Sequence, residues 1–272
     1  MNVRVRFAKY GAVKFIGHLD VLRYFQKAVR RAGLKIAYSQ GFHPHQIMSF
    51  ASPLGVGITS EGEYMDMELT AEYTPKEIVD ALNSAMVEGF TVLSARILPE
   101  PENGRKRETA MSLVTVADYL VTVKETDGFF SKRPLSELQE QWTCFYHQES
   151  IPVIKLVKKS NTETTIDLKP FLYEASITSE TLKKVGPRKN TKDFYTVEPI
   201  PEFSFDQEED CKKKGLFSVL LRVSAGSADN IKPELVLEAF AKFLGCENTD
   251  VLRFQIHRLN MYSGAYPLLV QL

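Results

Sequence analysis

The chain has 272 residues, enough to bury a sizeable core in one domain or two. Its hydrophobic fraction of 44% and charged fraction of 25% are ordinary for a globular protein, and no apolar run approaches the length of a membrane-spanning helix. The basic residues near the N-terminus do not fit a signal peptide, so we expect a cytoplasmic protein with no membrane contact. The three cysteines are far apart, which argues against a disulfide framework: Cys144, Cys211 and Cys246.

A net charge of zero hides a strong asymmetry along the chain. Residues 1–60 contain nine lysines and arginines and one acid, whereas residues 61–100 contain nine acids and two bases. Such a split can steer a polyanion toward one face of the protein. Alternatively, the two segments neutralise each other within one domain.

The first hundred residues are predicted to form a β-α-β-β-α-β unit, the ferredoxin-like order. Apolar residues alternate with Arg4 and Arg6 in the first strand, and residues 18–34 have the apolar spacing of a helix. Strands are expected near 47–50, 64–69 and 90–97. The clearest local signal is Thr74-Pro75-Lys76-Glu77, a capping box that begins a second helix ending at Gly89.

After a proline-rich linker at 99–105, the order of elements partly repeats. We expect a strand at 113–124, a helix at 135–146, a hairpin at 153–158 and 164–169, a strand at 216–223, a helix at 233–244 and a strand at 251–259. The fold class is therefore predicted as α+β, with two ferredoxin-like units in tandem over residues 1–100 and 110–272. The second unit has one strand too many and an insertion at about 179–215, whose runs of charge predict a mobile loop.

Several short motifs resemble the radical-SAM-linked protein family, a bacterial family known as a domain of unknown function. They are Phe15–Asp20, Arg30–Leu34, Tyr38–Pro44, Ser60–Tyr64, the stretch from Ser224–Ser227 through Pro233-Glu234, and His257–Leu259. The resemblance spans nearly the whole chain, but Gly17, His43 and His45 stand where the family pattern has Ser, Asn and Pro. It implies association with a radical S-adenosylmethionine (radical SAM) protein and a setting in RNA maturation or modification. It implies no activity for this chain itself.

Histidines supply the catalytic candidates. His18 lies beside Asp20 near a helix start, where the pair could act as a general base or could only cap the helix. His43 and His45 flank Pro44, and in an extended segment their side chains point the same way. No third ligand lies nearby, so we predict no metal and no cofactor. The chain also lacks a cysteine triplet for an iron–sulfur cluster, which excludes a radical SAM enzyme.

Basic residues supply the candidate binding surface. Four of them follow one stripe of the first helix, and two more alternate along the first strand: Arg23, Lys27, Arg30 and Arg31, with Arg4 and Arg6. Such residues can neutralise RNA phosphates, and the aromatic side chains Tyr38 and Phe42 could stack on unpaired bases. The motif loop beside them contains Gln40, Gly41, Phe42, His43 and Pro44. The alternative is a solvated or inter-domain charged face.

The sequence therefore favours an accessory protein that binds tRNA or rRNA and works with a radical SAM protein. Two alternatives stay open. One is an endoribonuclease that uses His18 or His43, and the other is a protein–protein adaptor without RNA contact.

Overall fold

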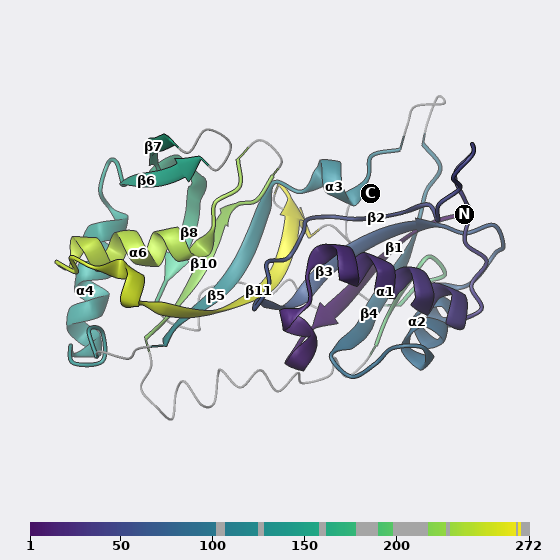
Figure 1. Ribbon diagram of the computed structural model, residues 1–272, viewed down its shortest axis with the longest axis horizontal. Helices are drawn as coiled ribbons and strands as arrows, with labels where there is room; N and C mark the ends of the chain where they lie inside the picture. Colours follow the sequence, from purple (N-terminus) through teal and green to yellow (C-terminus); the bar gives the residue numbers. More distant parts are fainter. Residues whose placement is uncertain are drawn as a thin grey trace. The chain divides into compact units, whose positions relative to one another are not determined.

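The computed structural model describes residues 1–101, 107–124, 128–157, 162–177, 190–197, 217–226, 229–264 and 266–267. The chain forms two compact α+β units (Figure 1). Unit 1 comprises Met1–Thr115, Lys184–Phe205 and Arg258–Leu272, and unit 2 comprises Val116–Lys183 and Asp206–His257. Unit 1 thus takes in two segments from the second half of the chain, which the sequence-based boundaries leave in the second domain. No helix in the described residues is long and apolar enough to cross a membrane.

Unit 1 is a sheet with two main helices. Its elements are β1 (Asn2–Lys9), the 3-10 helix η1 (Gly11–Phe15), α1 (His18–Arg31), β2 (Met48–Phe50), β3 (Thr59–Glu68), α2 (Pro75–Ser84), β4 (Phe90–Leu98), α3 (Ala110–Leu113), β9 (Phe194–Thr196), β12 (Tyr266–Pro267) and the part of β11 (Arg253–Ser263) from Arg258 on. The strand order is β11-β3-β1-β4-β9, and β2 also pairs with β3. Strand β1 is antiparallel to both β3 and β4.

Helices α1 and α2 build the core of unit 1 against one face of this sheet (Figure 1). Phe25 of α1 is fully buried and contacts the ring of Phe7 on β1, at a centroid distance of 4.6 Å. The opposite side of α1 carries its charged residues, as the helical spacing predicts. Gly33 follows the helix with φ of 71°, a left-handed conformation that favours glycine and ends the helix.

The predicted capping box of α2 is confirmed. The Thr74 hydroxyl accepts a hydrogen bond from the Glu77 amide, and the Glu77 carboxylate accepts one from the Thr74 amide at 2.7 Å. These bonds satisfy two amides that a helix start leaves without partners. They also lower the pKa of Glu77, because the backbone hydrogen bond and then the Thr74 hydroxyl favour the carboxylate.

Unit 2 contains a four-stranded stretch of sheet and a separate hairpin. Its elements are β5 (Val116–Lys124), α4 (Leu135–Tyr146), β6 (Pro152–Val157), β7 (Thr162–Asp167), the 3-10 helix η3 (Lys169–Phe171), β8 (Leu172–Ser176), β10 (Ser218–Ser224), α6 (Pro233–Phe243), the 3-10 helix η4 (Thr249–Val251) and the part of β11 up to His257. The strand order is β8-β10-β5-β11, whereas β6 and β7 pair with each other.

Aromatic side chains fill the core of unit 2 around Phe240 of α6. The Phe240 ring lies edge-on to Trp142 of α4, with centroids 4.8 Å apart, and also contacts Phe145, Phe130 and Phe217. All five rings are buried. This cluster ties the two helices of unit 2 together.

Two expectations need correction. The strand expected at 113–124 begins at Val116, because residues 110–113 form the short helix α3, which Thr109 caps. The expected charged loop at 179–215 contains strand β9, whose residues 194–196 pair with β4. Most of that insertion lies outside the described residues, including the charged residues Lys183, Lys184, Arg188, Lys189, Asp206, Glu208, Glu209 and Asp210.

Candidate nucleic-acid interface

Helix α1 presents an exposed basic stripe on its outer side. Arg23, Lys27 and Arg30 are all exposed, and their spacing places them within one narrow sector of the helix. Arg23 also forms an ion pair with Asp20 at 3.1 Å, between two exposed side chains. Such a surface pair is weak, so it leaves the arginine able to meet another anion.

Arg31 lies at the edge of this stripe and has structural contacts. Its guanidinium donates a hydrogen bond to the Ala85 carbonyl at 2.9 Å and lies over the Tyr24 ring at 5.6 Å. It therefore links α1 to the end of α2, and the stripe for contact with phosphates rests on Arg23, Lys27 and Arg30.

The motif loop lies beside this stripe. Its ends meet at a bridge between Tyr38 and Gln46, and the Gln46 side chain donates a hydrogen bond to the Gln26 carbonyl of α1 at 3.2 Å. Gln26 is one helical turn from both Arg23 and Arg30. The bond thus fixes the base of the loop next to the basic residues.

The tip of the motif loop is exposed, with these residues open to solvent: Gln40, Gly41, Phe42, His43 and Pro44. The Phe42 ring is fully exposed, at 102% relative accessibility, so both of its faces are open to contact with a ligand or partner. Gly41 has φ of 111°, a value that favours glycine and turns the chain just before Phe42. Tyr38 is also exposed at the base of the loop.

His18 and Asp20 do not form a pair. Asp20 is exposed and bonded to Arg23, whereas His18 is half-buried and lies edge-on to the Phe50 ring at 5.6 Å. His45 likewise has a local partner, because its Nδ1 atom lies 2.8 Å from the Ser39 hydroxyl. Among the described residues, no group of three or more His, Cys, Asp or Glu side chains could hold a metal ion.

A buried ion cluster lies under the start of α1. Arg258 of β11 donates from Nη1 to both carboxylate oxygens of Glu63 on β3, at 3.0 and 3.2 Å, and both side chains are buried. The same guanidinium reaches the carbonyls of Ser52 and Pro53, each at 3.4 Å. Sequence reasoning did not propose Glu63 and Arg258 as site residues, although both stand in motifs that carry the family resemblance.

Lys9 completes this cluster from β1. Its ammonium group donates to the Ile16 carbonyl at 3.0 Å and the Lys14 carbonyl at 3.4 Å, and so holds η1 in place. Burial lowers the pKa of Lys9, the Glu63 carboxylate opposes that shift, and Arg258 adds to it. The adjoining cavity, which His18 also lines, measures about 10 Å³ and has room for about one water molecule. The cluster therefore anchors the segment before α1 and has no room for a substrate.

The expected exposed face around Arg4 and Arg6 is only partly realised. Arg4 is 2% exposed and forms a double hydrogen bond with the Asp66 carboxylate, at 2.7 and 2.9 Å. Asp66 also accepts a bond from the Ala110 amide of α3. Arg6 is half-buried and donates to the Glu61 carbonyl at 2.9 Å. The Arg4 side chain therefore stabilises the fold and does not belong to the candidate surface.

Exposed apolar side chains extend the surface at the start of α1, a feature that sequence reasoning missed. Phe15 of η1 and Leu19 of α1 are well exposed, as is Val56. The loop that carries Val56 is bonded to η1, since the Gly57 amide donates to the Lys14 carbonyl at 2.8 Å. One signal in the sequence could have revealed this patch. Leu19 is apolar but stands four residues before Arg23, so helical spacing places it on the same exposed side of α1 as the basic stripe.

Comparisons with known proteins give a family for this chain. Residues 2–233 match a family described as an uncharacterised protein conserved in bacteria, DUF2344. The comparison with curated proteins gives no match. Among solved structures, the chain is similar to one from the crystal structure of a Cbf5-Nop10-Gar1 complex, with a TM-score of 0.47 and 8% identity. The match covers 95% of this chain and 48% of the other, so this chain spans about half the length of that one.

Proposed function

This chain belongs to the uncharacterised bacterial family DUF2344, and we propose that it binds RNA through unit 1 as an accessory protein of a radical SAM enzyme. The interface is the basic stripe of α1, formed by Arg23, Lys27 and Arg30, together with Phe42 of the motif loop. The partner enzyme performs the chemistry, and this chain holds a tRNA or rRNA substrate.

The observation that carries the proposal is the fully exposed Phe42 ring on a loop bonded to α1. Basic side chains supply affinity for the phosphate backbone that does not depend on sequence. An exposed aromatic ring stacks on an unpaired base and contributes about 1–3 kcal/mol per base. Neither feature helps the fold, because Phe42 and the three basic side chains point to solvent.

The radical SAM partner is supported by the motif resemblance of the sequence. The exposed apolar patch of Phe15, Leu19 and Val56 offers a docking surface of the kind that a protein partner covers. Co-purification of this chain with radical SAM proteins of the same cell tests this part of the proposal. Loss of the complex in Leu19→Asp, with retained RNA binding, is the expected outcome.

The proposed fold is a tandem of two ferredoxin-like units. Support comes from the chain order and the strand order of each unit. Unit 1 runs β1-α1-β2-β3-α2-β4 with β2-β3-β1-β4 across its sheet, and unit 2 runs β5-α4-β8-β10-α6-β11 with β8-β10-β5-β11. The β6–β7 hairpin supplies the two strands beyond this order, whereas the sequence led us to expect one, because it gave no strand at the position of β8.

RNA binding is tested by fluorescence anisotropy with labelled bulk tRNA and rRNA fragments over a series of salt concentrations. We expect binding that weakens as salt rises. The variant Arg23→Glu/Lys27→Glu/Arg30→Glu should bind far more weakly, and its slope of log affinity against log salt should fall by about 2. Phe42→Ala should weaken binding of single-stranded RNA and leave the salt slope unchanged.

The matched control reverses three exposed lysines of unit 2, in Lys124→Glu/Lys132→Glu/Lys232→Glu. The net charge changes equally, so equal losses in both triple variants would mean that total charge and not the α1 surface governs binding. No RNA binding by the folded wild type would refute the proposal and favour the adaptor. RNA cleavage that His18→Ala or His43→Ala abolishes would favour the endoribonuclease.

A further inference from the structure

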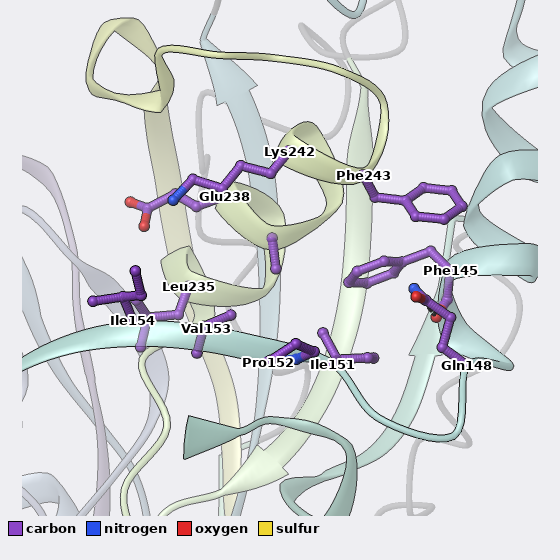
Figure 2. A pocket seen from close by; sticks show the side chains of 11 residues that line it. Phe145, Gln148, Ile151, Pro152, Val153, Ile154, Leu235, Glu238, Lys242 and Phe243 are labelled. Atoms are coloured by element: carbon purple, nitrogen blue, oxygen red, sulfur yellow. Dashed lines mark hydrogen bonds between the residues drawn. The ribbon is translucent and has the colours of Figure 1, made fainter. Parts of the chain in front are cut away.

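Unit 2 contains a cavity of about 390 Å³ between α4, β6 and α6 (Figure 2). This volume lies in the range of small-molecule sites, which are mainly apolar with a few polar groups. Its lining residues come from the end of α4, from residues 151–154 and from one side of α6. None of them belongs to the proposed RNA surface of unit 1.

The apolar wall comes from a second stripe of α6. Leu235, Ala239 and Phe243 recur every fourth residue and face the cavity, while Val236, Leu237 and Phe240 of the same helix are buried in the core of unit 2. Helix α6 is thus apolar on two sides. One side packs in the core of unit 2, and the other lines the cavity. Phe243 stays 41% exposed.

The far wall is formed by residues 151–154 at the start of the β6–β7 hairpin, of which Ile154 is well exposed. Asp167 holds this wall in place, because its carboxylate accepts a hydrogen bond from the Ile151 amide at 2.7 Å. Figure 2 shows Ile154 and Val153 opposite Leu235, with Phe145 and Phe243 at the other end of the cavity.

Charge is gathered at one end of this apolar cavity. Glu238 and Lys242 lie together there, away from Phe145 (Figure 2). Glu234 stands one helical turn before Glu238, and its Oε2 atom is buried with no hydrogen-bond partner among the described residues. Burial raises the pKa of Glu238, and the Glu234 carboxylate adds to the rise, while Lys242 opposes it. Asp250 and Lys232 also act on Glu238, so three carboxylates stand against two lysines and leave this end with one excess negative charge.

We propose that this cavity binds a small organic amine, with its apolar or aromatic body between α6 and β6 and its ammonium group at Glu238. The ammonium group would neutralise the one excess negative charge at this end, and the body of the ligand would cover the apolar stripe of α6. A ligand that carries only a carboxylate fits the same volume but meets like charge.

The single tryptophan of the chain provides the readout. The Trp142 ring lies 5.5 Å from the ring of Phe145, which lines the cavity, so a ligand in the cavity should change its fluorescence. The probes are phenethylamine, phenethyl alcohol and phenylacetate, which share an aromatic ring and differ in charge. We expect the amine to bind about two- to fivefold more tightly than the alcohol, and phenylacetate to bind most weakly.

Three variants connect this preference to the cavity. Glu238→Gln should remove the preference for the amine over the alcohol, and Ala239→Leu should weaken all three probes because it fills the cavity. Lys242→Gln, the matched control on the same helix, should leave the amine preference intact or increase it. Thermal unfolding confirms that each variant is folded, and Leu235→Phe replaces Ala239→Leu if the latter is not. Equal affinity for the amine and phenylacetate, or an amine preference that survives in Glu238→Gln, overturns the proposal.

Discussion

Arg258 and Glu63 are 195 residues apart in the chain, yet the Arg258 guanidinium lies 3.0 Å from the Glu63 carboxylate in the interior of unit 1. Both side chains are almost fully buried. Together with the bonds from Arg258 to the carbonyls of Ser52 and Pro53, the pair joins β3, β11 and the loop after β2. Segments that carry the family resemblance thus meet at one point, below the start of α1.

Arg258→Met should destabilise the protein by about 3–5 kcal/mol, because it leaves the Glu63 carboxylate buried without its main partner. The free energy of unfolding, measured by circular dichroism in urea, checks this value. Lys9 alone does not compensate, since its ammonium group donates to the carbonyls of Lys14 and Ile16.

The double variant Glu63→Gln/Arg258→Met tests whether the buried charge is the cause. It removes both charges, so we expect it to recover more than half of the stability that Arg258→Met loses. If the double variant loses as much as the two single variants combined, the pair acts through packing and not through charge.

Local features of unit 1 could be predicted from the sequence. The capping box of Thr74 and Glu77 and the amphipathic pattern of α1 depend on neighbours within one or two helical turns, and the structure reproduces both. The burial of Arg4 could not be predicted, because it depends on Asp66 in another strand and on the approach of α3. Strand β9 was also not predicted, because a strand of three residues is too short to show the alternating pattern of apolar residues.

The candidate site also combines local features that could be predicted with tertiary contacts that could not. The basic stripe followed from helical spacing, but the bond from Gln46 to the Gln26 carbonyl, which fixes the motif loop beside it, is a tertiary contact without a sequence signal. The cavity of unit 2 is lined by residues from 145–154 and from 235–243. These two segments are far apart in the sequence, and neither contains a motif that would predict a cavity.

Gly62→Ala should destabilise unit 1 by about 1–3 kcal/mol through overpacking. A Cβ atom at this position of β3 would lie 2.5 Å from the Asn260 Cα and 2.6 Å from the Leu259 carbonyl oxygen, both in the backbone of β11. A backbone cannot rotate away as a side chain can, so the two strands must separate. The shift in the urea midpoint measures the loss, and a variant as stable as the wild type would mean that β3 and β11 are farther apart.

Stability should fall in acid in part because of Asp167. Hydrogen bonds from the Ile151 and Lys169 amides lower the pKa of Asp167 below its ordinary value of 3.8. Its stabilising contribution is therefore complete well above pH 3.8 and is lost as the pH falls through the lowered pKa. Asp167→Asn keeps an acceptor oxygen but has no carboxyl group to protonate. As the pH is lowered below about 3.8, the thermal midpoint of this variant should therefore fall less than that of the wild type. If the thermal midpoints of both proteins fell equally with pH, the prediction would be contradicted.

Gly17→Ser should stabilise α1 by a few tenths of a kcal/mol. Gly17 is the N-cap residue of this helix, with φ of −77° and ψ of 166°, and no side chain caps the helix. These angles suit serine, and nothing lies within 4 Å of an added Cβ atom. A serine hydroxyl could accept a hydrogen bond from an amide of the first turn. The thermal midpoint should rise in Gly17→Ser and not in Gly17→Ala, which adds the Cβ atom without an acceptor. Equal midpoints in the two variants would show that the added Cβ atom, and not the cap, causes any change.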